Sequence, residues 1–451
     1  MDNTLVRKKT IYIKTFGCSL NQTDSENMAG LLKEAGFDVI CNYGISNHIW
    51  KKNPESKKEF DIAIINTCSV KNLAEAKFLK EFKQWKEKGK KIIVSGCIPQ
   101  AEPGMLDEVF KEVSVIGTRQ ITHVVDIVQD TLSGKIVHNI SNDYNERLNL
   151  PKIRKTGIIE ILPISEGCLS NCTYCKTKFA RGELLSYPKE KILMQFKSAL
   201  AQGCKEFWIT SQDNGCYGFD IYRKEKYFLP QLLNEMLAID GEFRIRVGMA
   251  NPDHIKRIKE ELIQTFKHPK IFKFLHVPIQ SGNNRILKLM KRFYTVKDYE
   301  DIINDFKKAI PEICISTDII VGFPGESEEE FMDSMKLIER TMPDVLNLSR
   351  FWLRKGTAAE RMEQISGGIS KKRSEEMKKF FDKISEKNNK RWVGKIDVAL
   401  IDELGKNNTL IARNNSYKQI ILMNNDKHKL GDFVDIKITG SGTYDLRGEI
   451  L

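Results

Sequence analysis

The sequence predicts an α/β protein with an N-terminal parallel-sheet domain, a central partial (β/α) barrel and a C-terminal small β-barrel. Two patterns support this fold class. Apolar strand-like runs alternate with helical patterns as far as Phe351, and short alternating segments separated by turn residues follow Trp392. A chain of 451 residues suits about three domains. We place the domains at residues 8–125, 150–385 and 388–451.

The first 125 residues contain four strand candidates rich in Ile and Val, with helical patterns between them. The predicted strands are 11–16, 62–66, 91–95 and 113–116, and the clearest helices are 23–35 and 73–88. Regular alternation of this kind predicts a parallel sheet with helices packed on it. The polar segment 141–156 contains Pro151 and shows no clear period, so we interpret it as a linker.

Six longer strand–helix units follow the linker. Their strands are predicted at 158–164, 206–211, 243–249, 271–277, 314–321 and 345–351. A capping box at Ser327–Glu330 marks the start of one of the helices. Successive right-handed crossovers favour a partial or complete barrel, and an open doubly wound sheet is the alternative.

The charge balance favours a polyanionic partner. The chain has 72 Lys plus Arg against 60 Asp plus Glu, and a Lys-rich helical pattern lies at 371–395. No apolar run is long enough for a membrane span, and the N-terminus lacks the apolar core of a signal peptide. We therefore expect a cytoplasmic protein with reduced thiols. The sequence contains neither a Walker A loop nor a Gly-x-Gly-x-x-Gly fingerprint, so NTP-driven and nicotinamide chemistry are unsupported.

Three cysteines with a C-x3-C-x2-C spacing are the sharpest signal in the chain. They are Cys168, Cys172 and Cys175, and they follow the first predicted strand of the central barrel. Three thiolates can hold three irons of a 4Fe-4S cluster and leave the fourth iron open to an external chelator. A zinc site is the rival interpretation, but it needs a fourth ligand, and Cys204 lies 29 positions beyond Cys175.

A second set of cysteines is dispersed in the sequence. Cys18, Cys68 and Cys97 each follow a predicted strand of the N-terminal domain. In a parallel sheet the carboxyl ends of the strands lie along one edge, so this set predicts a second three-thiolate site. Buried structural cysteines are the alternative. The remaining four are predicted to be core residues: Cys41, Cys204, Cys216 and Cys314.

The motifs around these cysteines resemble a known family. The C-x3-C-x2-C set with Tyr174 before its third cysteine is similar to the radical S-adenosylmethionine (SAM) superfamily. The contexts Gly17-Cys18-Ser19-Leu20-Asn21, Asn66-Thr67-Cys68 and Ser95-Gly96-Cys97 resemble the methylthiotransferases within it. The run from Glu166 to Gly182 is similar to the archaeal and eukaryotic branch, which modifies threonylcarbamoyladenosine 37 of tRNA. Further matches are His276-Val-Pro-Ile-Gln-Ser-Gly282 and Val321-Gly-Phe-Pro-Gly-Glu326, and the C-terminal segment resembles the RNA-binding TRAM barrel, an OB-like fold.

The resemblance implies two 4Fe-4S clusters. Cys168, Cys172 and Cys175 would ligate the cluster that binds SAM, whose reductive cleavage yields a 5′-deoxyadenosyl radical that abstracts hydrogen from C2 of the adenine. Cys18, Cys68 and Cys97 would hold an auxiliary cluster that delivers the methylated sulfur. The product would be 2-methylthio-N6-threonylcarbamoyladenosine. The cofactor carries out this chemistry, and the protein positions the reactants and excludes water.

Other residues are predicted around SAM by their placement after barrel strands. They are Tyr174, Gln212, Asp213, Arg246, Gln280, Ser281 and Gly322. An arginine can grip a carboxylate with two hydrogen bonds, although a strand-end salt bridge is the plainer role for Arg246. Arg181-Gly182 follows the third cysteine closely, and we expect it to contact SAM or RNA. His276 is interpreted as structural.

The resemblance also names partners and alternatives. We expect the anticodon stem-loop of tRNA as substrate, together with an electron donor and a sulfur source, and the basic helix at 371–395 to contact phosphates. The same chemistry on isopentenyladenosine 37 or on a ribosomal-protein aspartate is an alternative. A non-catalytic RNA-binding protein with structural zinc is a third, which metal analysis would separate.

Overall fold

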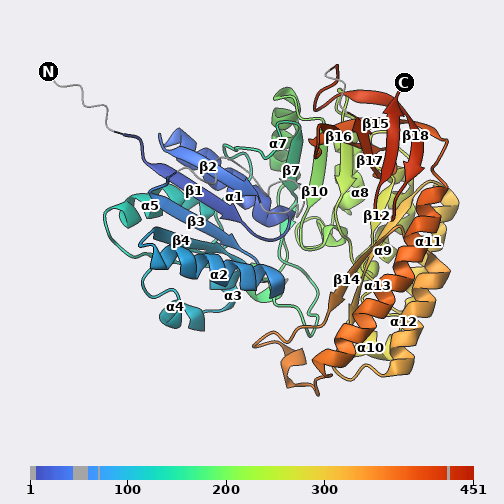
Figure 1. Ribbon diagram of the computed structural model, residues 1–451, viewed down its shortest axis with the longest axis horizontal. Helices are drawn as coiled ribbons and strands as arrows, with labels where there is room; N and C mark the ends of the chain where they lie inside the picture. The colour runs from blue at the N-terminus through green and yellow to red at the C-terminus, as the bar shows by residue number, and fades with distance from the viewer. Residues whose placement is uncertain (1–6, 44–58, 70–71, 424–426) are drawn as a thin grey trace. The chain divides into compact units, whose positions relative to one another are not determined.

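The computed structural model describes residues 7–43, 59–69, 72–423 and 427–451, and the chain divides into two units (Figure 1). The first unit comprises residues 1–155 and the short segment 176–183. The second comprises residues 156–175 and 184–451. The chain therefore leaves the second unit directly after Cys175 and returns to it at Leu184. The three-domain division stays a prediction.

The first unit is built on a six-stranded parallel sheet with the order β2-β1-β3-β4-β5-β6. The strands are β1 (Thr10–Thr15), β2 (Asp38–Tyr43), β3 (Ile62–Thr67), β4 (Lys91–Gly96), β5 (Ser114–Ile116) and β6 (His138–Asn139). The parallel sheet predicted from the sequence is confirmed. The edge strand β2 was not predicted, because it is only partly buried and lacks a continuous apolar run.

Helices cover both faces of this sheet. They are α1 (Ser19–Glu34), α2 (Asn72–Glu87), α3 (Cys97–Ala101), α4 (Gly104–Glu108) and α5 (Val124–Leu132), with a 3-10 turn at Ile121–His123. Alternate strand residues enter two separate cores, since Ile64 packs in the cluster of α1 and α5 whereas Ile65 packs with Phe78 and Phe82 of α2. A sheet buried on both faces accounts for the near-continuous Ile and Val runs.

The segment predicted as a linker lies along α1. Tyr43 donates its hydroxyl to the Ile153 carbonyl at 2.6 Å, and the Ile153 N–H donates to the Glu26 carbonyl at 3.0 Å. A Cβ at Gly30 would overlap the Pro151 carbonyl, so only glycine allows this close approach. Residues 141–155 are thus an extended part of the first unit.

The second unit begins with a partial barrel of six parallel strands. They are β7 (Ile159–Pro163), β10 (Glu206–Thr210), β11 (Arg244–Val247), β12 (Phe274–His276), β13 (Cys314–Val321) and β14 (Val345–Arg350). Two three-stranded sheets are joined by a parallel bridge between Ile245 and Ile271. Among the described residues β7 and β14 do not pair, so the barrel is open on that side. A short antiparallel pair, β8 (Ser165–Glu166) and β9 (Leu185–Ser186), adjoins it.

Helices alternate with these strands as the sequence predicts. They are α7 (Lys189–Ala201), α8 (Leu229–Leu237), α9 (Pro252–Phe266), α10 (Asn284–Leu289), α11 (Val296–Ala309), α12 (Glu328–Thr341) and α13 (Gly367–Lys390), and α6 (Thr177–Arg181) belongs to the first unit. The capping box is present, because the Ser327 side chain accepts from the Glu330 N–H. The Lys-rich pattern forms α13, which begins earlier than predicted because Ser366 caps it.

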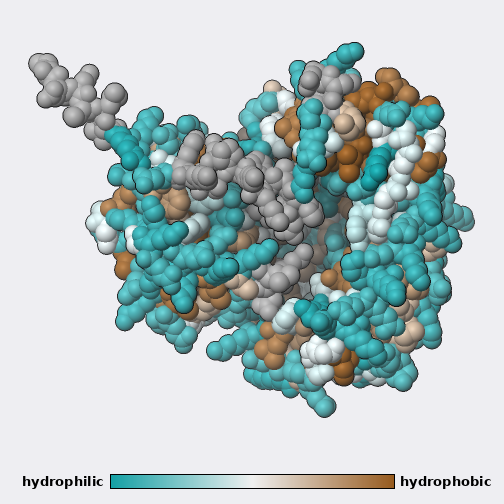
Figure 2. Space-filling model, in the orientation of Figure 1, coloured by the Kyte–Doolittle hydropathy of each residue, from teal (hydrophilic) through white to brown (hydrophobic). Residues whose placement is uncertain are grey.

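A closed five-stranded barrel of order β15-β16-β17-β19-β18 ends the chain. Its strands are β15 (Ile396–Leu404), β16 (Thr409–Asn414), β17 (Gln419–Met423), β18 (Phe433–Ser441) and β19 (Leu446–Ile450). In the view of Figure 2, hydrophobic residues gather over this barrel, whose exposed apolar side chains include Ile396, Leu404 and Met423. Within the described ranges, no helix has both the length and the apolar character needed to cross a bilayer.

Candidate active site

The three N-terminal cysteines lie at the carboxyl ends of neighbouring strands. Strands β1, β3 and β4 are adjacent in the sheet, Cys68 directly follows β3, Cys97 directly follows β4, and Cys18 comes three residues after β1. Parallel pairing therefore brings to one sheet edge residues that are far apart in the sequence. Cys68 and Cys97 are buried, and Cys18 is exposed.

Asn21 and Gly17 show how closely this set converges. The thiols of Cys18 and Cys97 lie 3.8 and 3.7 Å from the same Asn21 Oδ1. A Cβ at Gly17 would lie 3.0 Å from the Cys68 sulfur and 2.6 Å from its Cβ, so the chain beside Cys18 packs directly on Cys68. Burial raises the pKa of the Cys97 thiol, and Arg181 opposes that rise. Three convergent thiols of this kind suit a metal cluster, whose binding would release their protons.

The second cysteine set occupies the loop after β7 and β8. Cys175 donates its N–H to the Cys172 carbonyl at 3.1 Å, and the Ser170 N–H lies 3.3 Å from the Cys168 sulfur. Arg292 approaches the Cys172 sulfur to 3.3 Å through Nη1. Burial raises the pKa of the Cys168 thiol to about 12, so this thiol is neutral until a metal displaces its proton. Backbone and guanidinium donors directed at sulfur are typical of iron–sulfur sites.

Gln212 and Asp213 support this loop. Gln212 accepts the Gly167 N–H at 2.7 Å, next to Cys168. The Asp213 carboxylate accepts from the backbone of Gly215 and Asn251, each at 3.0 Å, and lies 2.6 Å from His254 Nδ1. Asn251 in turn donates to Ser170 Oγ at 3.0 Å. The structure makes Asp213 a support of the cysteine loop, and its direct contact with SAM stays a prediction.

Arg246 lies on the inner side of the partial barrel among three aromatic rings. Its guanidinium is 5.5 Å from the ring centroid of Trp208 and 5.3 Å from those of Phe274 and Tyr417. Tyr417 comes from the turn between β16 and β17, and its hydroxyl donates to Glu206 at 3.0 Å. The C-terminal barrel thus reaches the inner face of the partial barrel, and cation–π contacts account for the position of Arg246.

The other predicted SAM contacts lie on two turns and on the cysteine loop. Gln280 has φ +73° and is bridged to Ile319, and Ser281 is fully buried. Gly322 also has a positive φ, and a Cβ there would overlap Ser370 of α13, so its glycine permits helix packing. The Tyr174 ring packs edge-on against Phe323 with centroids 6.2 Å apart. SAM binding at these positions stays a prediction.

A polar group on the inner face of the barrel was not singled out from the sequence. His276 Nε2 and Asn347 Nδ2 each lie 2.8 Å from Asp318 Oδ1, on three adjacent strands. Burial by itself would raise the pKa of Asp318, but these two hydrogen bonds hold it below its ordinary value. The sequence signal was weak, since Ser316, Thr317 and Asp318 are three consecutive polar residues in the otherwise apolar strand β13 and do not alternate with apolar ones.

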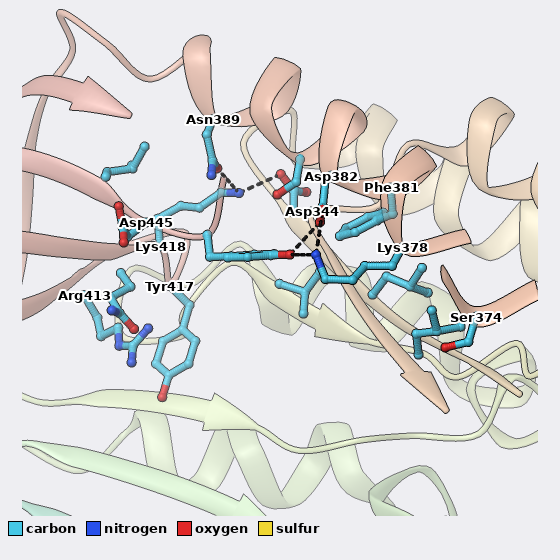
Figure 3. A pocket seen from close by; sticks show the side chains of 17 residues that line it. Asp344, Ser374, Lys378, Phe381, Asp382, Asn389, Arg413, Tyr417, Lys418 and Asp445 are labelled. Atoms are coloured by element: carbon cyan, nitrogen blue, oxygen red, sulfur yellow. Dashed lines mark hydrogen bonds and ion pairs between the residues drawn. The ribbon is translucent and has the colours of Figure 1, made fainter. Parts of the chain in front are cut away.

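Two remaining groups have clear positions. Cys204, Cys216 and Cys314 are buried as predicted, whereas Cys41 on the edge strand β2 is half-buried. A cavity of about 460 Å³ lies between α13, β14 and the C-terminal barrel (Figure 3). Its lysines are paired with acids, because Lys418 lies 3.0 Å from Asp344 and Lys378 lies 2.5 Å from Asp382. This pairing makes the cavity a poor phosphate site.

Comparison with known proteins agrees with these features. Residues 10–117 match the family described as "Uncharacterized protein family UPF0004", residues 162–338 match the "Radical SAM superfamily", and residues 390–451 match the "TRAM domain". The chain is 40% identical over 445 residues to the "Probable threonylcarbamoyladenosine tRNA methylthiotransferase" of Pyrococcus horikoshii, covering 98% of this chain and 99% of that protein. The chain belongs to the threonylcarbamoyladenosine tRNA methylthiotransferase family.

Family membership extends to eukaryotic relatives. The human threonylcarbamoyladenosine tRNA methylthiotransferase is 36% identical over 457 residues, which cover 99% of this chain and 75% of the human one. The radical SAM superfamily uses a 4Fe-4S cluster and SAM, and the C-x3-C-x2-C set lies within the matched residues. The donors around Cys168 and Cys172 fit such a cluster.

Solved structures support the fold. The radical S-adenosylmethionine methyltransferase TsrM from Kitasatospora setae is 14% identical, with a TM-score of 0.54 covering 76% of this chain and 73% of TsrM. The cobalamin-dependent S-adenosylmethionine radical enzyme OxsB is 17% identical, with a TM-score of 0.52 covering 84% of this chain and 56% of OxsB. The radical SAM fold, the parallel sheets and the small closed barrel predicted from the sequence are confirmed.

Proposed function

We propose that this chain is a tRNA methylthiotransferase that inserts a methylthio group at C2 of N6-threonylcarbamoyladenosine 37. The observation that carries the proposal is the presence of two three-cysteine sets, one at the carboxyl ends of three adjacent parallel strands and one in the loop after β7 and β8. One set suits radical generation, and the second suits sulfur delivery. The full-length similarity to archaeal and human enzymes named for this substrate supports the choice of nucleoside.

The proposal requires a second 4Fe-4S cluster at Cys18, Cys68 and Cys97. Their convergence around Asn21 and Gly17 supports this ligand set. When bound, the two clusters supply the electron that cleaves SAM and the sulfur that forms the new carbon–sulfur bond. The chain's own residues would hold these centres and exclude water from them.

SAM would bind beside Cys168, Cys172 and Cys175. The proposed contacts are the predicted ones: Tyr174, Gln212, Asp213, Arg246, Gln280, Ser281 and Gly322. Gln212 and Asp213 already fix the loop that carries Cys168, which supports their place beside the ligand. The polar group of His276, Asp318 and Asn347 offers further hydrogen-bonding partners on the inner face of the barrel.

The anticodon stem-loop would be held by α13 and the TRAM barrel. Apart from Lys378, which pairs with Asp382, the lysines exposed on α13 are Lys371, Lys372, Lys379, Lys383, Lys387 and Lys390. Several cations on one helix suit a phosphate backbone. We place the reaction in the cytoplasm, where a low-potential electron donor and a sulfur source must also act on the enzyme.

The test is a product assay with defined tRNA anticodon stem-loops. Anaerobically reconstituted protein, SAM, sulfide and dithionite are incubated with stem-loops carrying threonylcarbamoyladenosine, isopentenyladenosine or unmodified adenosine at position 37. Mass spectrometry of the digested RNA is expected to show the methylthio product only from the threonylcarbamoyl substrate. A Cys18→Ala/Cys68→Ala/Cys97→Ala protein is the matched control and is expected to cleave SAM without forming this product. Product from the isopentenyl substrate alone would contradict the proposed specificity, and zinc without iron would contradict the proposed chemistry.

A further inference from the structure

Each of the two cysteine sets has one arginine beside it, buried in the case of Arg181 and half-buried in the case of Arg292. In the first unit Arg181 Nη2 donates to Asn21 Oδ1 at 3.1 Å, and the thiols of Cys18 and Cys97 lie 3.8 and 3.7 Å from the same oxygen. Arg181 also opposes the rise in the pKa of the Cys97 thiol that burial causes. In the second unit Arg292 lies 3.3 Å from the Cys172 sulfur. The two arginines come from different elements: Arg181 ends α6, within the run from Glu166 to Gly182, and Arg292 lies in the segment after α10. Each site therefore has a guanidinium beside its cysteines, supplied by a different part of the chain.

Arg181 is held rigidly in the first unit. Its side chain is 1% exposed, and its Nη2 donates to Asp24 Oδ2 at 2.8 Å and to Asn21 Oδ1 at 3.1 Å. Asn21 Oδ1 is also the atom approached by the Cys18 and Cys97 thiols. The guanidinium thus lies beside the cysteines of its own unit, and the contact of Arg181 with SAM or RNA stays a prediction.

The segment 176–183 that carries Arg181 is anchored by several other contacts. Thr118 Oγ1 donates to the Ala180 carbonyl at 2.8 Å, and Arg119 Nη2 donates to the Arg181 carbonyl at 3.1 Å. Ala180 also packs against Cys97 and Ala101. We therefore expect the segment to keep its position without the Arg181 side chain. Anchoring the segment is then not the main role of this guanidinium.

Arg292 is held with equal precision in the second unit. Its Nε donates to the Tyr294 hydroxyl at 2.7 Å, and its Nη2 donates to the Pro278 carbonyl at 3.2 Å. Tyr294 is itself fixed, since its hydroxyl donates to the Ile279 carbonyl at 2.9 Å. The remaining amino group, Nη1, points at Cys172. Together these contacts fix the orientation of the Arg292 guanidinium.

A guanidinium beside a ligand sulfur changes how readily a cluster accepts an electron. Reduction adds negative charge to the cluster, and a fixed cation with an N–H···S hydrogen bond stabilises that charge. The reduction potential is therefore higher with the arginine present. Residues that hydrogen-bond to metal ligands also orient those ligands and increase their affinity for the metal.

We propose that Arg181 and Arg292 are the positioning residues of the two clusters, each raising the reduction potential of its own cluster and of no other. The part concerning Arg181 rests on the second cluster of the proposed function. Two separate arginines let the two potentials be set independently, although both clusters are carried by one chain.

The test measures each cluster in isolation by EPR-monitored redox titration of the full-length, anaerobically reconstituted chain. The Cys168→Ala/Cys172→Ala/Cys175→Ala protein isolates the N-terminal cluster, and the Cys18→Ala/Cys68→Ala/Cys97→Ala protein isolates the SAM cluster. Arg181→Met is expected to lower the midpoint potential of the first protein and leave the second unchanged. Arg292→Met is expected to do the reverse. Arg181→Lys and Arg292→Lys keep the positive charge but lose the planar guanidinium. They are expected to give smaller shifts in midpoint potential than the methionine variants.

Thr118→Val is the matched control for Arg181. It removes an anchor of segment 176–183 without touching a cysteine, so it is expected to leave the potential of the N-terminal cluster unchanged. A Thr118→Val shift as large as that of Arg181→Met would overturn the proposal, because loosening of the segment would then explain both. Selective loss of iron from the N-terminal site in Arg181→Met, with Thr118→Val fully loaded, would support it.

The outcomes separate this proposal from the proposed function. If the Cys168→Ala/Cys172→Ala/Cys175→Ala protein binds no iron, the second cluster and the proposed function both fail. If it binds about four irons and neither Arg181→Met nor Arg181→Lys shifts its potential, only the role of Arg181 fails. An unshifted SAM cluster in the Arg292 variants likewise overturns the role of Arg292.

Discussion

At the scale of single residues, the loop that carries Cys168 is supported by one buried pair of hydrogen-bonded side chains, Asp213 and His254. Asp213 and His254 are 2% and 5% exposed and lie 2.6 Å apart, and Asp213 also accepts two backbone N–H groups. The carboxylate therefore connects the loop after β10 with the start of α9, where Asn251 contacts Ser170. Asp213, which is predicted to contact SAM, also stabilises the cysteine loop through its hydrogen bond to Asn251.

Loss of His254 is expected to weaken this support. His254→Ala leaves the Asp213 carboxylate buried without its side-chain partner, which should lower the free energy of unfolding by about 2–4 kcal/mol. His254→Asn places an amide N–H near the position of Nδ1 and should recover most of the loss. Urea unfolding of the apoprotein measures both. Equal stability of wild type and His254→Ala would show that the pair contributes nothing.

Glu326 provides a pH-dependent readout of the packing between Gly322 and α13. Burial raises the pKa of Glu326 to about 7, although Gly322 donates to its carboxylate at 2.7 Å and Arg373 at 2.8 Å. The native state therefore binds a proton more readily than the unfolded chain. This contribution to stability is present below the unfolded pKa and is lost as the pH rises through about 7.

Glu326→Gln is expected to flatten that pH dependence. Between about pH 5 and 7 the wild-type free energy of unfolding should fall relative to that of the variant by up to about 1.4 kcal/mol per pH unit. Urea titrations of both proteins at several pH values measure this difference. Because other titrating groups affect both proteins alike, their contributions cancel in the comparison. Parallel curves for the two proteins would contradict the raised pKa.

At the scale of elements, helix α1 and segment 141–155 fit together through a missing side chain. Gly30→Ala would force a methyl group into the Pro151 backbone. We expect this overpacking to lower the free energy of unfolding by about 1–3 kcal/mol. Gly104→Ala in α4 is the matched control, because a Cβ there meets no neighbouring atom, and it should be neutral or slightly stabilising. Thermal unfolding compares the two variants. Equal melting temperatures would contradict the close approach.

The elements also show what the sequence could predict. Runs of Ile and Val located β1, β3, β4, β5 and the strands of the partial barrel, and parallel pairing makes the strand ends that carry the cysteines meet. The position of Arg246 could not be predicted, since it depends on Tyr417 from the C-terminal barrel. Arg181 and Arg292 were missed at their sulfurs for the same reason. Their partners are distant in the sequence, and the periodicity of apolar residues does not indicate such contacts.

At the scale of the whole molecule, RNA binding is expected to depend on the exposed lysines of α13. Replacing Lys372, Lys379 and Lys383 by Gln should weaken tRNA binding and lower the slope of log affinity against log salt by about 2, since each phosphate that a lysine neutralises contributes roughly 0.7–0.9. Fluorescence anisotropy over a range of salt concentrations measures both effects. An unchanged slope would exclude α13 from the RNA interface.

The proposed reaction requires that one chain holds two separate iron–sulfur clusters. Iron and sulfide analysis of anaerobically reconstituted wild type beside the Cys18→Ala/Cys68→Ala/Cys97→Ala protein decides whether it does. We expect about eight irons in wild type and about four in the variant. About four irons in both proteins would show that the N-terminal cysteines are structural and would contradict the methylthiotransferase mechanism proposed for this chain.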